Sequence, residues 1–539
     1  MQNDRLTVST TGGPVTGVAQ PAQAGQPGQP GETGTEAWYG VPYAAPPVGE
    51  LRFRRPQPVF PRTEPLAATR WGHSPMQQPM PEAMPEAMGG VGDTPGTTPD
   101  IDEDCLTLNI VRPAGEGREG SEDTGSEAAS GLPVMVWIYG GAFTVGASRN
   151  YDGRHLAARG DVIVVTVNYR VGPWGFLDFS ALSTPGGPVF ESNTGLHDQI
   201  AALTWIRDNI AAFGGDPDNV TVFGESAGGS SVLALMCMPA AQGLFHRVIA
   251  ESPAVAGTGA ASQERWARRF AELLAPDAAT DADLGRALLS ATQDELLATV
   301  GKLAGVSAVE APGTVLYGPC IDGESLPEPV LRAFAAGRQA RVPLIIGTNE
   351  HEGLLFLVGA QKSGAEILPV YPDTVRRHLG EKPAVPDLLA TYPGFPDPVE
   401  SARVGGDLLF WYPATVVADA HGAVAPTYSY RFDYVSQDPR FGALGATHGQ
   451  EIPYVFGRIR AVLAAEGAGS TGEVDRDVVF SEQVMDRWLG FARDGIPDAA
   501  WPVYRAADRT VQVLDEDCVL QQDPLGERRA AWAAVFGGE

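Results

Sequence analysis

The sequence contains few of the residues that build disulfide frameworks or metal centres. Its 539 residues include only four cysteines (Cys105, Cys237, Cys320 and Cys518), which are widely spaced and form no CxxC pair, and its eight histidines are not clustered. Disulfide scaffolds and zinc sites both require closely spaced sets of such residues. We therefore expect neither a disulfide framework nor a bound metal, and no cofactor is implied.

Positive charge is also scarce. Lys and Arg total 38 against 66 Asp and Glu, which gives a formal net charge of −28. This excess would repel phosphate backbones and anionic lipid surfaces, so we expect no nucleic-acid partner and no membrane partner. We interpret the acidity mainly as an aid to solubility.

Long apolar runs are absent. No uninterrupted apolar stretch approaches twenty residues, and the first forty residues contain no basic start followed by seven or more apolar residues. The sequence therefore predicts a cytoplasmic protein. The 43% hydrophobic content is sufficient for a large core.

Two segments have the composition of surface inserts. Residues 19–36 and 114–131 are poor in apolar residues and rich in Gly, Pro or charge, which predicts mobile segments. The second lies between the strand-like runs "CLTLNIVRP" and "PVMVWIYGGAF", which favours an enlarged hairpin loop over a domain boundary. We predict a single domain over residues 1–539.

From residue 133 onward, strand-like and helical patterns alternate. Apolar runs at 133–141, 161–170, 246–252 and 342–350 read as strands, and apolar residues recur at helical spacing in 197–215. Strands that are apolar on both faces indicate a mostly parallel, doubly wound α/β sheet covered by helices on both sides. Further strands before residue 112 and near 510–517 are expected at its edges. Segment 260–330 and much of 360–440 are predicted to be helical and to cap the carboxyl ends of the strands.

The segment "VTVFGESAGGSSVLALM", residues 220–236, begins as a strand and ends as a helix. Ser226 lies at the junction, between Gly224 and Gly228, which carry no Cβ atoms to clash in a sharp turn. This pattern is typical of a nucleophile elbow, which exposes a serine hydroxyl above the N-terminus of a helix.

A nucleophilic serine needs a base and an acid to orient that base. In α/β-hydrolases the acid and then the histidine follow the serine along the chain. Glu350 and Glu352 lie at the end of a predicted strand, and His448 lies farther on between small residues in a loop. His155, His246, His378 and His421 lie in polar contexts or near helix ends, where we expect ordinary solvated roles.

Acyl transfer also needs donors for the carbonyl oxygen, which gains negative charge in the reaction. Gly140, Gly141 and Ala142 follow a predicted strand, and their N–H groups, with that of Ala227 after the serine, are candidates.

These segments resemble the type-B carboxylesterases, the family that includes bacterial para-nitrobenzyl esterases and the cholinesterases. The likeness extends over nearly the full length, through "YGVPYAAPPVGELRF", "EDCLTLNI", "VMVWIYGGAF", "VNYRVGPWGFL", "GLHDQIAALTWIRDNIAAFGGDPDNVTVFGESAGG", "EHEG" and "HGQEIPYVFG". It implies an α/β-hydrolase fold with helical cap insertions. It further implies Ser226 as nucleophile, Glu352 as acid, His448 as base, and Gly141, Ala142 and Ala227 as oxyanion donors.

The sequence also departs from the family pattern. Secreted members pair the cysteine of the "EDC" segment with one upstream, but Met76 is near that position here, so Cys105 should be a free thiol. The segment from Met76 to Glu103 has no tryptophan, which argues against choline esters. Its methionines either form an adaptable pocket flap or fill a gap beneath an ordinary loop; they are Met76, Met80, Met84 and Met88.

The sequence therefore predicts a serine carboxylesterase that acts through an acyl-enzyme on esters with short to medium acyl groups and apolar or aromatic alcohols. The expected pocket residues are Phe143, Glu225, Leu354, Leu355 and Phe356. Hydrolysis of carbamates or amides by the same triad stays open. A non-catalytic, esterase-like binding protein is disfavoured because such proteins typically lose the serine. We expect a monomer or a weak homo-oligomer.

Overall fold

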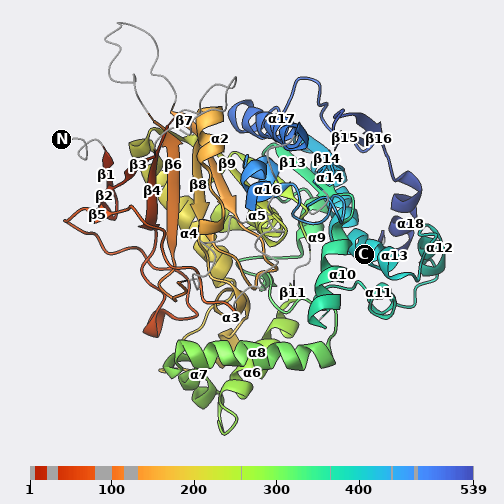
Figure 1. Cartoon of the computed structure of the whole chain (residues 1–539). Helices are drawn as coiled ribbons and strands as arrows, with labels where there is room; N and C mark the ends of the chain where they lie inside the picture. The colour runs from red at the N-terminus through yellow and green to blue at the C-terminus, as the bar shows by residue number, and fades with distance from the viewer. Residues whose placement is uncertain are drawn as a thin grey trace, which may run out of the picture.

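The computed structural model describes residues 6–20, 34–78, 100–114, 131–255, 258–364, 366–438, 441–465 and 472–537. These residues include an eleven-stranded sheet, which Figure 1 shows through the middle of the molecule. In spatial order the strands are β16 (Leu520–Gln522), β15 (Thr510–Leu514), β14 (Thr427–Phe432), β13 (Leu344–Asn349), β10 (Arg247–Glu251), β9 (Gly215–Glu225), β7 (Leu132–Ile138), β8 (Ile163–Val167), β6 (Thr107–Pro113), β4 (Thr35–Pro42) and β3 (Val18–Gln20).

The centre of this sheet is parallel and its edges are antiparallel. Every pairing from β15 to β8 is parallel, whereas β16 at one edge and β6, β4 and β3 at the other pair antiparallel. The predicted α/β fold and the predicted edge strands are confirmed. Strand β14 was not predicted, since it lies in a range that was read as mostly helical.

The hairpin predicted around residues 114–131 is wrong. Strand β6 pairs with β8 through Leu108 and Val167, and β8 pairs with β7 through Ile163 and Val134. Strand β8 therefore lies between the two strands that the segment joins. Local sequence patterns predict strands but not their lateral order, which depends on contacts between distant segments.

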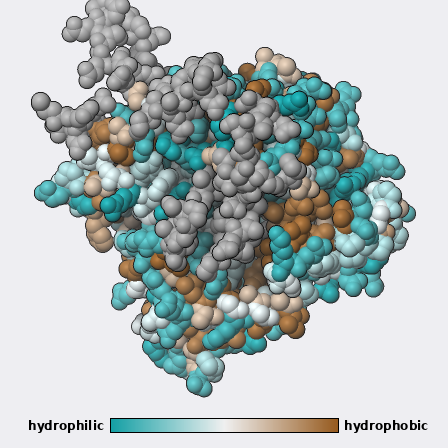
Figure 2. All heavy atoms as spheres, viewed as in Figure 1, coloured by the Kyte–Doolittle hydropathy of each residue, from teal (hydrophilic) through white to brown (hydrophobic). Residues whose placement is uncertain are grey.

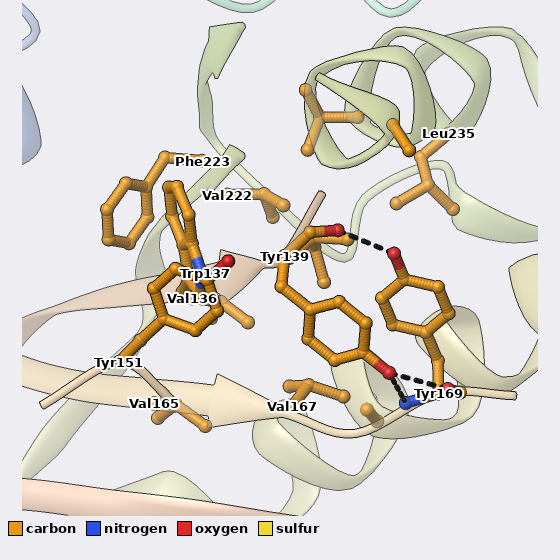
Figure 3. Close-up of a cluster of buried hydrophobic side chains, with 14 of the residues drawn as sticks. Val136, Trp137, Tyr139, Tyr151, Val165, Val167, Tyr169, Val222, Phe223 and Leu235 are labelled. Carbon is orange, nitrogen blue, oxygen red and sulfur yellow. Dashed lines mark hydrogen bonds between the residues drawn. The ribbon is translucent and has the colours of Figure 1, made fainter. Parts of the chain in front are cut away.

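Helices pack on both faces of the sheet. Because successive strand residues point to opposite faces, Phe223 packs against Phe456 on one face while Val222 faces the other. In Figure 3, Trp137 and Phe223 lie on one side and Leu235 of helix α5 on the other. The first face is covered by α2 (Arg154–Gly160), α15 (Ile452–Val455), α16 (Ile459–Ala465) and α17 (Gly472–Asp494), and the second by α3 (Gly172–Phe176), α4 (Thr194–Asn209), α5 (Ala227–Cys237), α9 (Val330–Ala335) and α14 (Tyr412–His421).

The segments between the later strands are helical, as predicted. One group lies together at the bottom of Figure 1 and comprises α6 (Ala260–Leu274), α7 (Asp281–Ser290) and α8 (Gln293–Glu310). A second group, on the right, comprises α10 (Glu352–Ser363), α11 (Pro372–Leu379), α12 (Val385–Ala390), α13 (Pro398–Gly406) and α18 (Gly526–Phe536). The remaining described strands are short: β1 (Thr7–Thr10), β2 (Gly13–Thr16), β5 (Leu66–Ala67), β11 (Thr258–Gly259) and β12 (Cys320–Ile321).

Several predictions fall wholly or largely outside the described residues. These are the mobile inserts near 19–36 and 114–131 and the roles of Met80, Met84 and Met88, whereas Met76 is described and buried. The single-domain organisation stays a prediction. Within the described ranges, no helix combines the length and the apolar character needed to cross a bilayer.

Two tyrosines fix the ends of β7 and β8 to each other. The rings of Tyr139 and Tyr169 stack with centroids 4.2 Å apart. The Tyr139 hydroxyl donates to the carbonyl of Tyr169 over 2.7 Å, and the Tyr169 hydroxyl donates to the carbonyl of Tyr139 over 2.5 Å (Figure 3). Both side chains are fully buried. The pair therefore holds the backbone immediately before the glycines of the "YGGAF" segment.

We predict that Tyr169→Phe lowers the free energy of unfolding by about 1–3 kcal/mol, because it leaves the buried Tyr139 carbonyl without this donor. Tyr430→Phe is the matched control. The Tyr430 hydroxyl is buried with no hydrogen-bond partner among the described residues, so its removal should be nearly neutral or stabilising. Urea unfolding of both variants measures the difference, and equal losses would contradict the prediction.

Candidate active site

Ser226 lies in a strained turn between β9 and α5. Its backbone has φ 57° and ψ −120°, and its N–H donates to the carbonyl of Glu251 at the end of β10 over 2.9 Å. A Cβ at position 228 would lie 1.9 Å from the carbonyl oxygen of Ile138, and one at Gly224 would lie 2.5 Å from that same oxygen. Both positions therefore require glycine, and the turn holds Ser226 in a conformation that is rare for a residue with a side chain.

His448 and Glu352 form a close pair. Imidazole Nδ1 lies 2.5 Å from Glu352 Oε2, so it carries the proton that the carboxylate accepts. The other oxygen, Oε1, accepts from the Ser252 hydroxyl over 2.6 Å and from the Asn349 N–H over 2.7 Å. All four side chains are buried. The carboxylate is thus held by three donors, which fix the orientation of the imidazole.

The structure distinguishes Glu352 from Glu350, the other strand-end carboxylate. The Glu350 side chain is 43% exposed and lies 3.6 Å from His351 rather than against His448. The sequence reasoning missed Ser252 and Asn349. Their positions at the carboxyl ends of β10 and β13 were the available signal, because polar residues at such ends gather at one edge of a parallel sheet.

Imidazole Nε2 faces the base of the serine turn. It lies 3.1 Å from Glu225 Oε1, and it has no hydrogen-bond partner among the described residues. Catalytic hydrogen bonds are often long in free enzymes and tighten when substrate binds. The nitrogen next to the serine turn is therefore the one that is available to take a proton.

Glu225 belongs to a group of buried carboxyl groups. Burial, with Glu352 and Glu251 nearby, raises the pKa of Glu225 well above its usual range. Burial likewise raises the pKa of Glu451, and it raises that of Glu251 to about 8 although Trp488 donates to Glu251 Oε1 over 2.8 Å. Sequence reasoning did not predict this group. Glu225 was predicted to line the pocket, but the structure buries it fully, next to Ser226 in the chain and in contact with His448, rather than on an open pocket wall.

The candidate oxyanion donors lie in a second strained turn, after β7. Ala142 and Phe143 both have positive φ, 54° and 58°. Within the described ranges, the N–H groups of Gly141 and Ala142 donate to no protein acceptor. Ala227 is the first residue of α5, where an N–H has no acceptor inside the helix. These groups are available to an anionic oxygen.

The remaining predicted pocket residues lie around this turn and α10. Phe143 is buried against Phe176, with ring centroids 4.5 Å apart. Leu354 and Leu355 are partly exposed on α10, and Figure 2 shows hydrophobic side chains in the area where Figure 1 places that helix. Phe356 is buried, with its ring centroid 5.0 Å from that of His448.

The other histidines and the cysteines lie outside this group. The solvated role expected for His421 is wrong: it is fully buried, and its Nε2 lies 2.9 Å from the Val342 carbonyl and its Nδ1 3.0 Å from the Gln339 amide. All four cysteines are free, and Cys105 is buried.

Comparison with known proteins agrees with this geometry. The sequence profile of the carboxylesterase family matches residues 4–374 and 399–532. The chain belongs to the carboxylesterase family. It is 37% identical over 502 residues to the para-nitrobenzyl esterase of Bacillus subtilis (strain 168), covering 92% of this chain and 94% of the relative.

Mammalian members and solved structures are also similar. Rabbit (Oryctolagus cuniculus) cocaine esterase is 34% identical over 512 residues, covering 90% of this chain and 89% of the relative. A solved structure of a PNB esterase aligns with a TM-score of 0.80 at 34% identity, covering 97% of this chain and 99% of the other. The predicted α/β-hydrolase fold is confirmed, and this carboxylesterase is a carboxylic ester hydrolase.

The raised pKa of Glu251 predicts a pH-dependent stability. Between pH 4.5 and about 8 the folded state holds a proton on Glu251 that the unfolded chain has released, so this residue lowers stability as the pH rises through that window. Glu251→Gln keeps the acceptor for Trp488 and removes the titration. We expect the melting temperature of the variant, relative to the wild type, to increase from pH 5 to pH 8. A difference that stays constant or shrinks would contradict this.

Proposed function

We propose that this carboxylesterase hydrolyses esters through a covalent acyl-enzyme on Ser226. The observation that carries the proposal is the Glu352 and His448 pair, with 2.5 Å between Oε2 and Nδ1, beside a serine in a strained strand-to-helix turn. Nothing in this mechanism requires a cofactor.

In the first half of the reaction, His448 Nε2 takes the proton of the Ser226 hydroxyl while Oγ attacks the ester carbonyl carbon. Glu352 holds the imidazole through Nδ1 and stabilises the imidazolium that forms. Negative charge moves to the carbonyl oxygen, where the N–H groups of Gly141, Ala142 and Ala227 donate.

In the second half, the imidazolium gives its proton to the leaving alcohol and the carbon–oxygen bond breaks. Water then attacks the acyl carbon while His448 takes a proton from the water. The bond from this carbon to Ser226 Oγ breaks, the imidazolium returns the proton to Oγ, and the carboxylic acid leaves. Carbamates and amides would follow the same steps with a different leaving group, so they stay the second candidate substrates.

Substrates with short to medium acyl groups and apolar or aromatic alcohols fit best. Leu354 and Leu355 of α10 are apolar and partly exposed near Glu352, and a relative with 37% identity is named for the para-nitrobenzyl group. The cytoplasmic location, the lack of nucleic-acid or membrane partners, and the monomeric or weakly oligomeric state stay predictions.

The triad assignment predicts a graded loss among three variants. Ser226→Ala should lower kcat to a residual value about 10³-fold above the uncatalysed rate, because only substrate binding and the oxyanion donors remain. Glu352→Gln should lose far more kcat than Glu350→Gln, since the Glu350 carboxylate does not contact His448. Steady-state kinetics with para-nitrophenyl butyrate and melting curves for all three variants form the test. A greater loss in the Glu350 variant would reverse the assignment.

Acyl length provides the test of the substrate class. We expect kcat/KM to be higher for para-nitrophenyl acetate, butyrate and octanoate than for palmitate, with measurable turnover of tert-butyl acetate. A para-nitrophenyl carbamate in the same series separates the two candidate functions. An optimum on palmitate, or a jump in rate when tributyrin exceeds its solubility, would identify a lipase instead.

A further inference from the structure

A rare helical turn lies beside the His448 and Glu352 pair. Helices α13 and α14 are continuous with each other through a π-helical turn, η7 (Asp407–Trp411), with helical backbone at both joints. A π-turn inserts one residue into a helix and rotates the side chains that follow it relative to those before. Such turns lack the favourable geometry of the α-helix, so contacts on their two sides must hold them.

The inner side of this helix contacts both members of the pair. A Cβ at Gly406 would lie 3.0 Å from Glu352 Cβ and 2.7 Å from the Gly353 nitrogen, so the helix backbone lies directly on the start of α10. Phe410, in the π-turn, is buried with its ring centroid 4.4 Å from that of His448. The imidazole thus contacts Phe410 as well as Phe356, and the two phenyl rings stack on each other at 5.9 Å.

The outer side of the π-turn is bound to the C-terminal helix α18. The buried Asp407 carboxylate accepts from the Tyr392 hydroxyl over 2.5 Å and from the Arg528 guanidinium over 3.1 Å. Trp532, also on α18, donates its indole N–H to the Tyr392 oxygen over 2.8 Å. Figure 1 shows α18 beside α12, and the two helices are in contact.

Apolar contacts reinforce this attachment. Leu408 and Trp411 of the π-turn pack against a buried cluster that contains Tyr392, Trp532 and Val535. Phe410 belongs instead to the cluster of Phe356 and Leu357 on α10. Leu409 packs against that cluster as well. The π-turn therefore divides its side chains, with Leu409 and Phe410 directed to the side of α10 and the active site, and Leu408 and Trp411 directed to α18.

We propose that α18 positions the catalytic histidine, with Arg528 and Asp407 holding the π-turn and Phe410 acting as the positioning residue for His448. The inference rests on the serine mechanism proposed above. A ring packed on the imidazole limits its rotation away from the Glu352 axis, and an aromatic face attracts the imidazolium that forms during the reaction. Removing the Arg528 charge leaves a buried carboxylate with one donor fewer, which releases the turn.

The chain offers a matched control for this test. Arg528 and Arg529 are neighbours on α18, and each pairs with an aspartate, Arg528 with Asp407 and Arg529 with Asp523 over 2.7 Å. Only the first pair contacts the π-turn. Arg528→Met should lower kcat several-fold with KM changed less than about twofold, and Arg528→Lys should recover part of the loss, whereas Arg529→Met should leave both constants unchanged.

Phe410→Leu should lower kcat about tenfold, since it keeps an apolar group but removes the ring from His448. If Arg528 acts through Phe410, the double variant will lose no more than Phe410→Leu alone. Losses that multiply in the double variant, an unchanged kcat in Arg528→Met, or an equal loss in Arg529→Met would each overturn the proposal.

Two further variants keep the role of α18 testable if Arg528→Met does not fold, and separate this role from the serine mechanism. If Arg528→Met does not fold, Tyr392→Phe removes a single hydroxyl from Asp407 and should give the same selective loss of kcat. Ser226→Ala separates the two levels of the argument. Full activity in Ser226→Ala would overturn the serine mechanism, whereas its loss together with a normal Arg528→Met would overturn only the role of α18.

Discussion

The active site depends on one close approach between backbones. The first turn of α5 lies against the end of β7, and a side chain at position 228 would fall 1.9 Å from the Ile138 carbonyl oxygen. Because β7 and β9 are adjacent and parallel, their carboxyl ends meet at one edge, and this contact brings the turn of Ala142 next to the turn of Ser226. In the mechanism proposed above, neither strained turn would be useful without the other, since one would supply the oxyanion donors and the other the nucleophile.

The neighbouring strands complete the site in spatial order. Strand β10 ends beside β9, and there the Glu251 carbonyl accepts from Ser226 while Ser252 donates to Glu352. Strand β13 follows and carries Asn349, with Glu352 at the start of α10. Because the carboxyl ends of adjacent parallel strands lie side by side, polar residues that follow these strands are brought into contact although they are about a hundred positions apart in the sequence.

The sequence predicts those parts of the candidate site that short local motifs determine. The glycines around Ser226, the strand-end position of Glu352 and the loop position of His448 all leave a pattern, and the structure places Glu352 against His448. The lateral order of β6, β8 and β7 leaves no such pattern in the sequence, so the hairpin prediction was wrong. The π-turn at Phe410 was also invisible, because its residues fit an ordinary helix and only its tertiary contacts favour the extra residue.

The buried carboxyl groups differ in their surroundings in a way that composition alone could not reveal. Glu352 accepts hydrogen bonds from an imidazole, a hydroxyl and a backbone N–H. For Glu225 and Glu451, burial raises the pKa well above the usual range, so the neutral acid is favoured there. The two carboxyl groups that contact His448 therefore differ: Glu225, 3.1 Å from Nε2, favours the neutral acid, whereas Glu352, 2.5 Å from Nδ1, is the acceptor of three hydrogen bonds.

The separation of β6 from β7 has a practical consequence for handling this enzyme. Pro113 ends β6 and Leu132 begins β7, so both residues lie at the edge of the sheet where the parallel strands β7 and β8 begin. Ser226 follows the carboxyl end of the adjacent strand β9. The seven residues of β7 separate this end of the sheet from the amino end by about 20 Å. A solid support or fused protein attached beside Pro113 would therefore hold the molecule with its candidate active site turned outward, toward the substrate solution.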